Sequence, residues 1–261
     1  MRVLITGITG FVGGHLAERL LAAGGCAVAG VARVARGTGW PVGLGHLAGK
    51  AELIAGDIHD TAAMEAVLRR VQPDWVFHLA GYANTGKSFQ EPDACWEANL
   101  TGTRRFLDAV ARSGLTPRLL FASTGLVYGD PDPGRADLDE TAVLKPASPY
   151  AASKAAADLL GYQLSRQPGL DLVRIRLFNQ IGPRQSADFA AANFARQIAA
   201  AEAGRQPPVV TTGDLSAWRD LTDVRDMADA MVLLLRHAPA GEVYNAGSGR
   251  VHRIRDVLHS L

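Results

Sequence analysis

The sequence predicts an α/β fold built on a doubly wound parallel sheet. From the first residue onward, short runs of β-forming residues alternate with longer, alanine-rich stretches that favour helices. Runs such as WVFHL and LVRIRL have the high apolar density that is typical of strands covered by helices on both faces. The strands are predicted near residues 3–6, 27–31, 52–55, 75–79, 119–123, 172–177 and 243–245, with helices between them.

Three glycines follow the first predicted strand in the pattern GxxGxxG, and an amphipathic helix begins directly after them. Gly7, Gly10 and Gly13 permit a tight turn and let backbone N–H groups approach a pyrophosphate at the positive end of the helix. Phe11 and Val12, which lie between these glycines, are also candidate cofactor contacts. The motif predicts a Rossmann-like dinucleotide-binding domain, and a purely structural turn is the alternative.

The end of the second strand bears on which dinucleotide is bound. An acidic residue there bonds the ribose 2′-hydroxyl of NAD, but here the strand ends Val-Ala-Arg, with Arg33 followed closely by Arg36. Guanidinium groups attract a 2′-phosphate, so NADP(H) is favoured and NAD(H) is possible; the alternative is that both arginines are solvated loop residues. Asp57, beside Ile58, could accept from the adenine amino group or cap a plain turn.

The chain divides at about residue 178. Residues 1–178 are predicted to form the dinucleotide-binding domain, to which the last sheet strand returns at about 241–246. After a turn come a helix at 189–203 and a proline-bearing loop with one short strand. Residues 179–261 are therefore predicted to be mostly a smaller substrate-binding lobe.

Composition narrows the class of protein. With 261 residues, 48% of them hydrophobic, the chain can bury the core of one large domain or of a domain with a smaller lobe. A formal charge of +1 offers no net field for nucleic acid or an anionic membrane, and no apolar run approaches the roughly 20 residues that span a bilayer. Cys26 and Cys95 lie far apart, without the spacing of a metal site or a disulfide framework. A cytoplasmic location and no metal are expected.

Tyr150 and Lys154, in the run SPYAASK, are the candidate proton-transfer pair. On a helix they share one face, where the ammonium is expected to favour the ionised phenol and make it usable as an acid or base. Thr124, with Ser123 before it, ends a strand at the carboxyl edge of the sheet, where ligands bind in such folds. Each feature alone has a simpler reading, since Tyr and Lys are common on solvated helix faces and hydroxyl groups often form turns.

Several motifs together resemble one family. The glycine pattern, HLAG at 78–81, ANLTGT at 98–103, STGLVYG at 123–129, YAASK at 150–154, RIRLFNQIGPRQ at 174–185, WRDLTDVRD at 218–226 and GEVYNAGSG at 241–249 occur in the expected order over nearly the whole chain. This combination resembles the extended short-chain dehydrogenase/reductase family, and within it the branch of nucleotide-sugar epimerases, dehydratases and reductases.

The resemblance implies roles for named residues. Thr124, Tyr150 and Lys154 match the catalytic Ser/Thr, Tyr and Lys, and Lys154 also holds the nicotinamide ribose. Asn99 matches an asparagine whose role is expected to be structural. The other residues implied to bind ligands are Leu79, Ala80 and Gly81 for the cofactor, Asn179 and Arg219 for the substrate diphosphate, and Arg184, Asn193 and Arg196 for the nucleotide pocket.

The residues after Thr124 bear on the reaction. The 4,6-dehydratases of this family carry an acidic residue there, whereas this chain has Gly125 and Leu126. The run GPRQSADF, with NFARQIA and RDLTDVRDM, resembles GDP-4-keto-6-deoxymannose reductases. The expected function is therefore NADP(H)-dependent reduction of a nucleotide-diphospho-4-keto-6-deoxysugar, with GDP-4-keto-6-deoxymannose as the expected substrate. The alternatives are a 4-epimerase with bound NAD, a 4,6-dehydratase and a non-catalytic dinucleotide sensor.

Two expectations concern the whole chain. Helices at 91–113 and 148–166 match the pair that forms a four-helix dimer interface in relatives, so a homodimer is expected, although these faces could belong to the intramolecular core. Relatives usually continue beyond the position of Leu261. The substrate lobe is thus expected to be either compact or without a C-terminal tail.

Overall fold

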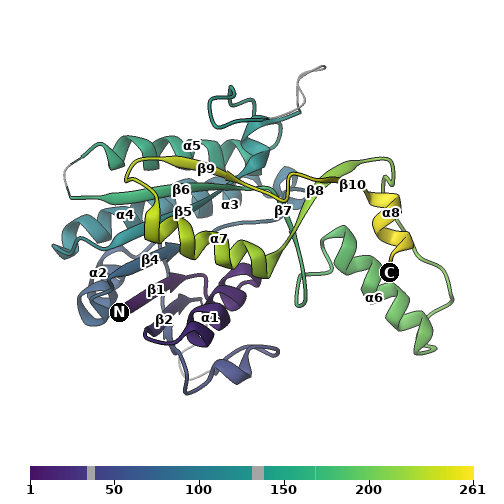
Figure 1. Cartoon of the computed structure of the whole chain (residues 1–261), viewed down its shortest axis with the longest axis horizontal. Helices are drawn as coiled ribbons and strands as arrows, with labels where there is room; N and C mark the ends of the chain where they lie inside the picture. The colour runs from purple at the N-terminus through teal and green to yellow at the C-terminus, as the bar shows by residue number, and fades with distance from the viewer. Residues whose placement is uncertain (34–38, 131–137, 168) are drawn as a thin grey trace.

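A seven-stranded parallel sheet forms the centre of the molecule. The computed structural model describes residues 1–33, 39–130, 138–167 and 169–261. The strand order is β3-β2-β1-β4-β5-β6-β9, and every neighbouring pair is parallel (Figure 1). The strands are β1 (Arg2–Thr6), β2 (Ala27–Ala32), β3 (Glu52–Ala55), β4 (Trp75–His78), β5 (Arg118–Thr124), β6 (Asp171–Leu177) and β9 (Val243–Ala246). Each of the seven predicted strands is confirmed, with ends that differ by at most one residue.

Helices cover both faces of this sheet. The helices α1 (Phe11–Ala23) and α7 (Val224–His237) pack together on one face, and α2 (Thr61–Val71), α4 (Gly102–Ser113) and α5 (Pro149–Ser165) cover the other. Successive strand residues point to opposite faces, so Val3 and Ile5 join the core under α1 and α7, whereas Leu4 joins the second core. The predicted doubly wound α/β fold is confirmed.

Local sequence signals start the helices that matter for the site. The helix α5 begins after Ser148, whose Oγ accepts from the backbone N–H of Ala151 at 3.1 Å, and Pro149 occupies its first position. Tyr150 therefore lies in the first turn of α5. The helix α1 begins after Gly10, which offers no side-chain cap, and its first turn holds no acidic residue.

The predicted helix at 91–113 is a continuous series of three pieces. These are α3 (Pro92–Trp96), a π-helical turn η3 (Glu97–Thr101) and α4. Asn99 lies within the π-helical turn and is 1% exposed. Such turns widen a helix locally and occur often at functional sites, but no sequence pattern distinguished this one.

A smaller lobe lies beyond the carboxyl ends of the last strands. Its three-stranded sheet has the order β10-β8-β7 and consists of β7 (Asn179–Ile181), β8 (Trp218–Asp223) and β10 (Val251–Arg253). The helices α6 (Ala190–Glu202) and α8 (Ile254–His259) pack against each other beside it (Figure 1). The sequence indicated one short strand in this region, whereas the structure contains three.

Three short 3-10 turns complete the described elements. They are η1 (Gly45–Leu47), η2 (Lys87–Phe89) and η4 (Gly125–Tyr128), the last of which follows β5 directly. No helix among the described residues combines the length and the apolar character needed to cross a membrane.

Candidate active site

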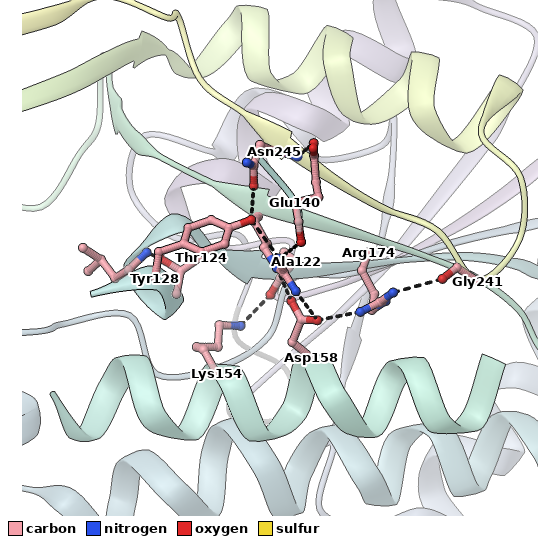
Figure 2. A network of polar contacts seen from close by, with 11 residues as sticks. Ala122, Thr124, Tyr128, Glu140, Lys154, Asp158, Arg174, Gly241 and Asn245 are labelled. Carbon is pink, nitrogen blue, oxygen red and sulfur yellow. Dashed lines mark hydrogen bonds and ion pairs between the residues drawn. The ribbon is translucent and has the colours of Figure 1, made fainter. Parts of the chain in front are cut away.

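The predicted catalytic side chains meet at the carboxyl end of β5. Tyr150, in the first turn of α5, shares a side-chain hydrogen bond with Thr124, the last residue of β5. Lys154, one helical turn further along α5, is 7% exposed and donates from Nζ to the carbonyl oxygen of Ala122 at 2.6 Å (Figure 2). Its ammonium also lies 5.0 Å from the ring centroid of Phe121. The structure thus brings Thr124, Tyr150 and Lys154 together.

Loss of contact with water controls the ionisation of half-buried Tyr150 and buried Lys154. Desolvation raises the pKa of Tyr150 to about 12, against the opposing effect of its hydrogen bond with Thr124. Desolvation lowers the pKa of Lys154 to about 8, although the negative charge of Asp158 opposes this change. The expected net lowering of the Tyr150 pKa is wrong for this structure, because desolvation outweighs any favourable effect of the Lys154 ammonium, which is hydrogen-bonded to Ala122.

The segment after Thr124 presents no acid or base to the site. The hydroxyl of Thr124 accepts from the backbone N–H of Leu126 at 3.3 Å and so begins the turn η4. A side chain on Gly125 would meet the ring of Phe178, with a Cβ about 3.1 Å from three ring atoms. The Phe178 ring therefore occupies the space into which a side chain at position 125, next to Thr124, would extend.

The glycine-rich turn has the shape of a dinucleotide cradle. Gly7 has a φ of 76°, and a Cβ there would lie 2.9 Å from the backbone nitrogen of Ala80. A Cβ on Gly13 would lie 2.3 Å from the carbonyl oxygen of Gly7. These close approaches need glycine, and the start of α1 beside them is free of carboxylates. The turn at Gly7 to Gly10, together with Phe11 and Val12 at the start of α1, therefore fits the pyrophosphate of a dinucleotide.

The residues predicted to contact the rest of the cofactor lie around this cradle. Burial opposes the ionisation of Asp57, but hydrogen bonds from His59 and the charge of Arg33 outweigh it and hold the pKa of Asp57 below its ordinary value. Arg33 and Asp57 are thus near neighbours at the ends of β2 and β3. Ile58 is buried in the core, and the predicted contact of Arg36 lies outside the described residues.

The turn at 79–81 is held from two sides. The backbone N–H of Ala80 donates to Thr6 Oγ1 at 3.2 Å, and Thr6 Oγ1 is also hydrogen-bonded to His78 Nδ1 at 2.8 Å. A Cβ on Gly81 would lie 2.7 Å from Asn99 Oδ1 and 3.7 Å from Lys154 Nζ. Leu79 and Ala80 therefore pack against the glycine turn, and Gly81 packs against Lys154.

Asn99 connects that turn to the backbone of Tyr150. Its Oδ1 accepts from the N–H of Tyr82 at 2.8 Å, and its Nδ2 donates to Ser153 Oγ at 3.0 Å. Ser153 Oγ in turn donates to the carbonyl oxygen of Tyr150 at 2.9 Å. This arrangement agrees with the structural role expected of Asn99, while Ser153 carried no sequence signal beyond its position inside YAASK.

A cavity of about 370 Å³ lies between the small sheet and α6. Three predicted substrate residues, Asn179, Asn193 and Arg219, line it, together with apolar side chains such as Phe189 and Ile254. Asn179 follows Phe178 directly, so the cavity begins beside the residue that packs on Gly125. The site and the cavity are therefore adjacent.

Two predicted substrate residues lie outside the lining of this cavity. Arg184 donates to Glu18 Oε2 at 2.7 Å and lies 3.2 Å from His15 Nδ1, which ties it to α1. Arg196 donates to Asn193 Oδ1 at 3.0 Å from the exposed side of α6. The described residues also contain no group of three or more His, Cys, Asp or Glu side chains placed to hold a metal ion.

Comparison with known proteins shows the family to which this chain belongs. Residues 3–247 match the NAD dependent epimerase/dehydratase family. The chain is 34% identical over 260 residues to GDP-6-deoxy-D-mannose reductase of Pseudomonas aeruginosa. The alignment covers 100% of this chain and 79% of that relative. The structure of RMD from Pseudomonas aeruginosa complexed with NADPH is 33% identical, with a TM-score of 0.85 over 99% of this chain and 81% of that one.

A second similar structure carries a different dinucleotide. Thermus thermophilus UDP-glucose 4-epimerase, in complex with NAD, is 34% identical, with a TM-score of 0.83 over 100% of this chain and 82% of that one. The family model, the sequence identity over the full chain and the fold agree with one another. The chain belongs to the NAD dependent epimerase/dehydratase family.

Proposed function

We propose that this protein is an NADPH-dependent reductase of the 4-keto group of a nucleotide-diphospho-6-deoxysugar, with GDP-4-keto-6-deoxymannose as the substrate. The similarity to GDP-6-deoxy-D-mannose reductase over the whole chain supports this reaction. The fit of the glycine turn to a pyrophosphate and the similar structure that contains NADPH support the cofactor. When bound, NADPH supplies the hydride that reduces the ketone carbon.

The described side chains provide the remaining steps. Tyr150 donates its phenolic proton to the ketone oxygen as that oxygen gains negative charge, and Thr124 donates a hydrogen bond to the same oxygen. Lys154, as an ammonium, stabilises the phenolate that remains on Tyr150 and holds the nicotinamide ribose. Carbon thus gains a hydride and oxygen gains a proton, so the product is an alcohol.

The observation that carries this choice is the pair Gly125 and Leu126. A dehydratase must remove a proton from carbon and release water, which requires an acid or base beside the tyrosine. Gly125 has no side chain and Phe178 fills the space next to it. A reductase needs only the hydride, the proton of Tyr150 and a pocket for the sugar.

The phosphate and nucleotide contacts complete the proposal. Arg219 and Asn179 line the cavity and would bind the diphosphate, since a guanidinium meets phosphate oxygens bidentately. Asn193 would bind the nucleoside, with Arg196 and Arg184 at its margin. Arg33, without a carboxylate at the end of β2, favours a 2′-phosphate and hence NADPH. We assign residues 179–261 mostly to the substrate lobe on these grounds.

Exposed apolar side chains and the two cysteines support the proposed assembly and location. Leu159 and Tyr162 on α5 are 56% and 48% exposed, and Trp96 on α3 is 38% exposed. These apolar surfaces support a homodimer formed through α3, α4 and α5. Cys26 and Cys95 are both free thiols, which supports a reducing, cytoplasmic location.

The direct test is reduction of the keto sugar by the purified protein. We expect NADPH absorbance to fall when GDP-4-keto-6-deoxymannose is added and to stay constant with GDP-mannose, which has no keto group. Tyr150→Phe should abolish the reaction but keep NADPH affinity, which separates an enzyme from a dinucleotide sensor. Absence of NADPH oxidation by the wild type would refute the proposal.

A 4-epimerase with bound NAD is the second candidate, supported by the similar UDP-glucose 4-epimerase structure. Such an enzyme would purify with NAD and interconvert UDP-glucose and its 4-epimer without added cofactor or net redox change. Analysis of the released nucleotide and of the sugar products distinguishes the two functions.

A further inference from the structure

A buried cluster of three charged side chains, Asp158, Arg174 and Arg176, lies one helical turn beyond Lys154. Asp158 is 0% exposed, and the two arginines that bond it, Arg174 and Arg176 on β6, are 5% and 4% exposed. Arg174 Nη1 donates to Asp158 Oδ1 at 2.7 Å (Figure 2). Arg176 Nε donates to Asp158 Oδ2 at 3.0 Å. One carboxylate thus pairs with two guanidiniums in the core between α5 and the sheet.

The cluster also fixes the segments next to the site. Arg176 Nη1 donates to Tyr128 Oη at 2.7 Å and to the carbonyl oxygen of Glu140 at 3.2 Å. Tyr128 Oη donates to Asn245 Oδ1 on β9 at 2.7 Å, as Figure 2 shows. Tyr128 is the last residue of η4, and Thr124 caps the start of that turn. The same arginine therefore restrains both α5 and the turn that follows Thr124.

Asp158 lies on the same side of α5 as Tyr150 and Lys154. It follows Lys154 by four residues and Tyr150 by eight, so the three side chains lie along one side of α5. The ionisable groups around Lys154 come from α5 and from the elements packed against it: Tyr150 and Asp158 on α5, Arg174 and Arg176 on β6, His78 on β4 and Cys95 on α3. Asp158 is the carboxylate of this group, and its charge stabilises the ammonium.

Stability alone is a poor reason for such a cluster. Burying a carboxylate and two guanidiniums costs desolvation energy that their attraction only partly returns, and apolar side chains of similar volume hold a helix to a sheet equally well or better. The hydrogen bonds and charges here reach the segments of Thr124, Tyr150 and Lys154. A role in positioning Thr124 and Tyr150 and in keeping Lys154 protonated accounts both for the burial of these charges and for their contacts with the catalytic segments.

We propose that Asp158 is a positioning residue for the reaction. Through Arg174 and Arg176 it fixes α5 against β6 and η4, and its negative charge keeps Lys154 in the ammonium form. The part of this inference that concerns turnover rests on the proposed reductase function. The part that concerns the charge of Lys154 does not.

The charge of Lys154 can be followed by NMR without any substrate. The sequence contains four lysines, Lys50, Lys87, Lys145 and Lys154, so protein labelled with ¹³C at lysine Cε gives few signals, and Lys154→Met identifies the relevant one. We compare wild type with Asp158→Asn, Asp158→Glu and the double variant Asp158→Asn, Arg174→Met. The double variant removes one negative and one positive charge, so its net charge equals that of wild type.

The proposal predicts an ordered set of titrations. In Asp158→Asn and in the double variant, the titration midpoint of Lys154 should fall by about one pH unit or more, because a carboxylate one helical turn away is lost. Asp158→Glu should restore most of the wild-type midpoint. Arg174→Met alone, which disrupts the cluster but keeps the carboxylate, should leave the midpoint at or above that of wild type. Should Asp158→Asn not fold, the double variant and Arg174→Met still decide the question.

Turnover gives the second readout. If the wild type reduces the keto sugar, the alkaline limb of kcat/KM in the double variant should move to lower pH with the Lys154 midpoint, and kcat should fall more than KM rises. A merely structural role would lower the unfolding midpoint of every variant while leaving the Lys154 titration unchanged, and that result would overturn the proposal. An inactive wild type with shifted Lys154 titrations would reject the reductase function but keep the role of Asp158 in charging Lys154.

Discussion

We expect the ionisation of Lys154 to limit the proposed reduction at alkaline pH. Its pKa, lowered by burial to about 8, lies far below the pKa of about 12 of Tyr150. Because reduction needs the ammonium and the protonated phenol together, kcat/KM should be constant at neutral pH and fall as the pH rises through about 8, while Tyr150 stays protonated. Initial rates of NADPH consumption from about pH 6 to pH 10 measure this limb. A rate that stays constant to about pH 10 would contradict the assignment.

The same residues show what the sequence could and could not predict about ionisation. The motif SPYAASK identified Tyr150 and Lys154, and helix spacing placed them on one face. It did not show that Lys154 reaches the carbonyl oxygen of Ala122 or that Asp158 meets two arginines from β6. Those contacts join residues 16 to 32 positions apart, and their burial depends on the packed core rather than on local pattern.

Adding a single methyl group at Gly13 is a test of the proposed dinucleotide-binding turn. Gly13→Ala would place a Cβ 2.3 Å from the carbonyl oxygen of Gly7, so the turn must open. We expect NADPH affinity to fall at least about ten-fold and the unfolding free energy by about 1 to 3 kcal/mol. Fluorescence titration with NADPH and chemical denaturation measure the two effects. Gly45→Ala is the control, because a Cβ there meets no atom within 4 Å.

His78 connects the strand β4 to the neighbouring elements β1 and α4. Its Nδ1 is hydrogen-bonded to Thr6 on β1 and its Nε2 to Thr103 on α4, and its ring stacks on Phe106. Burial lowers the pKa of His78 from 6.5 to about 3, so between these pH values the unfolded chain binds one more proton than the folded chain. Stability contributed by neutral His78 is therefore lost as the pH falls below 6.5.

This linkage predicts a measurable slope. The unfolding free energy should fall by up to about 1.4 kcal/mol for each pH unit below the unfolded pKa of His78. Urea denaturation at about pH 7.5 and pH 5 measures it in wild type and in His78→Gln. The variant should be less stable at the higher pH but show a shallower decline, since glutamine does not titrate. Equal slopes in both proteins would assign the acid sensitivity to other groups.

The elements themselves were largely predictable, because each of the seven sheet strands is a dense apolar run followed by a turn signal. The π-helical turn around Asn99 and the small sheet were not. A π-helical turn arises from tertiary packing, here the contacts of Asn99 with Tyr82 and Ser153. The strands β7 and β10 have three residues each and are too short for an alternating pattern to stand out.

The exposed apolar side chains of α5 support a surface at which two copies of the chain would associate. The proposed dimer would bury Leu159 and Tyr162 against the same helix of a second copy, and a charge there would remain unpaired in the interface. Leu233 on α7 is 55% exposed, nearly the same as the 56% of Leu159, but lies on the opposite face of the sheet. The two leucines therefore make a matched pair for substitution.

Leu159→Glu should convert the dimer to a monomer at micromolar concentration, whereas Leu233→Glu should leave it intact. Sedimentation velocity over a range of protein concentrations measures the association constant of each variant. Because both substitutions add the same charge at equally exposed leucines, a general effect on solubility or folding would appear in both. A monomeric wild type, or a dimer that survives Leu159→Glu, would remove α5 as the interface and leave its apolar surface to another partner.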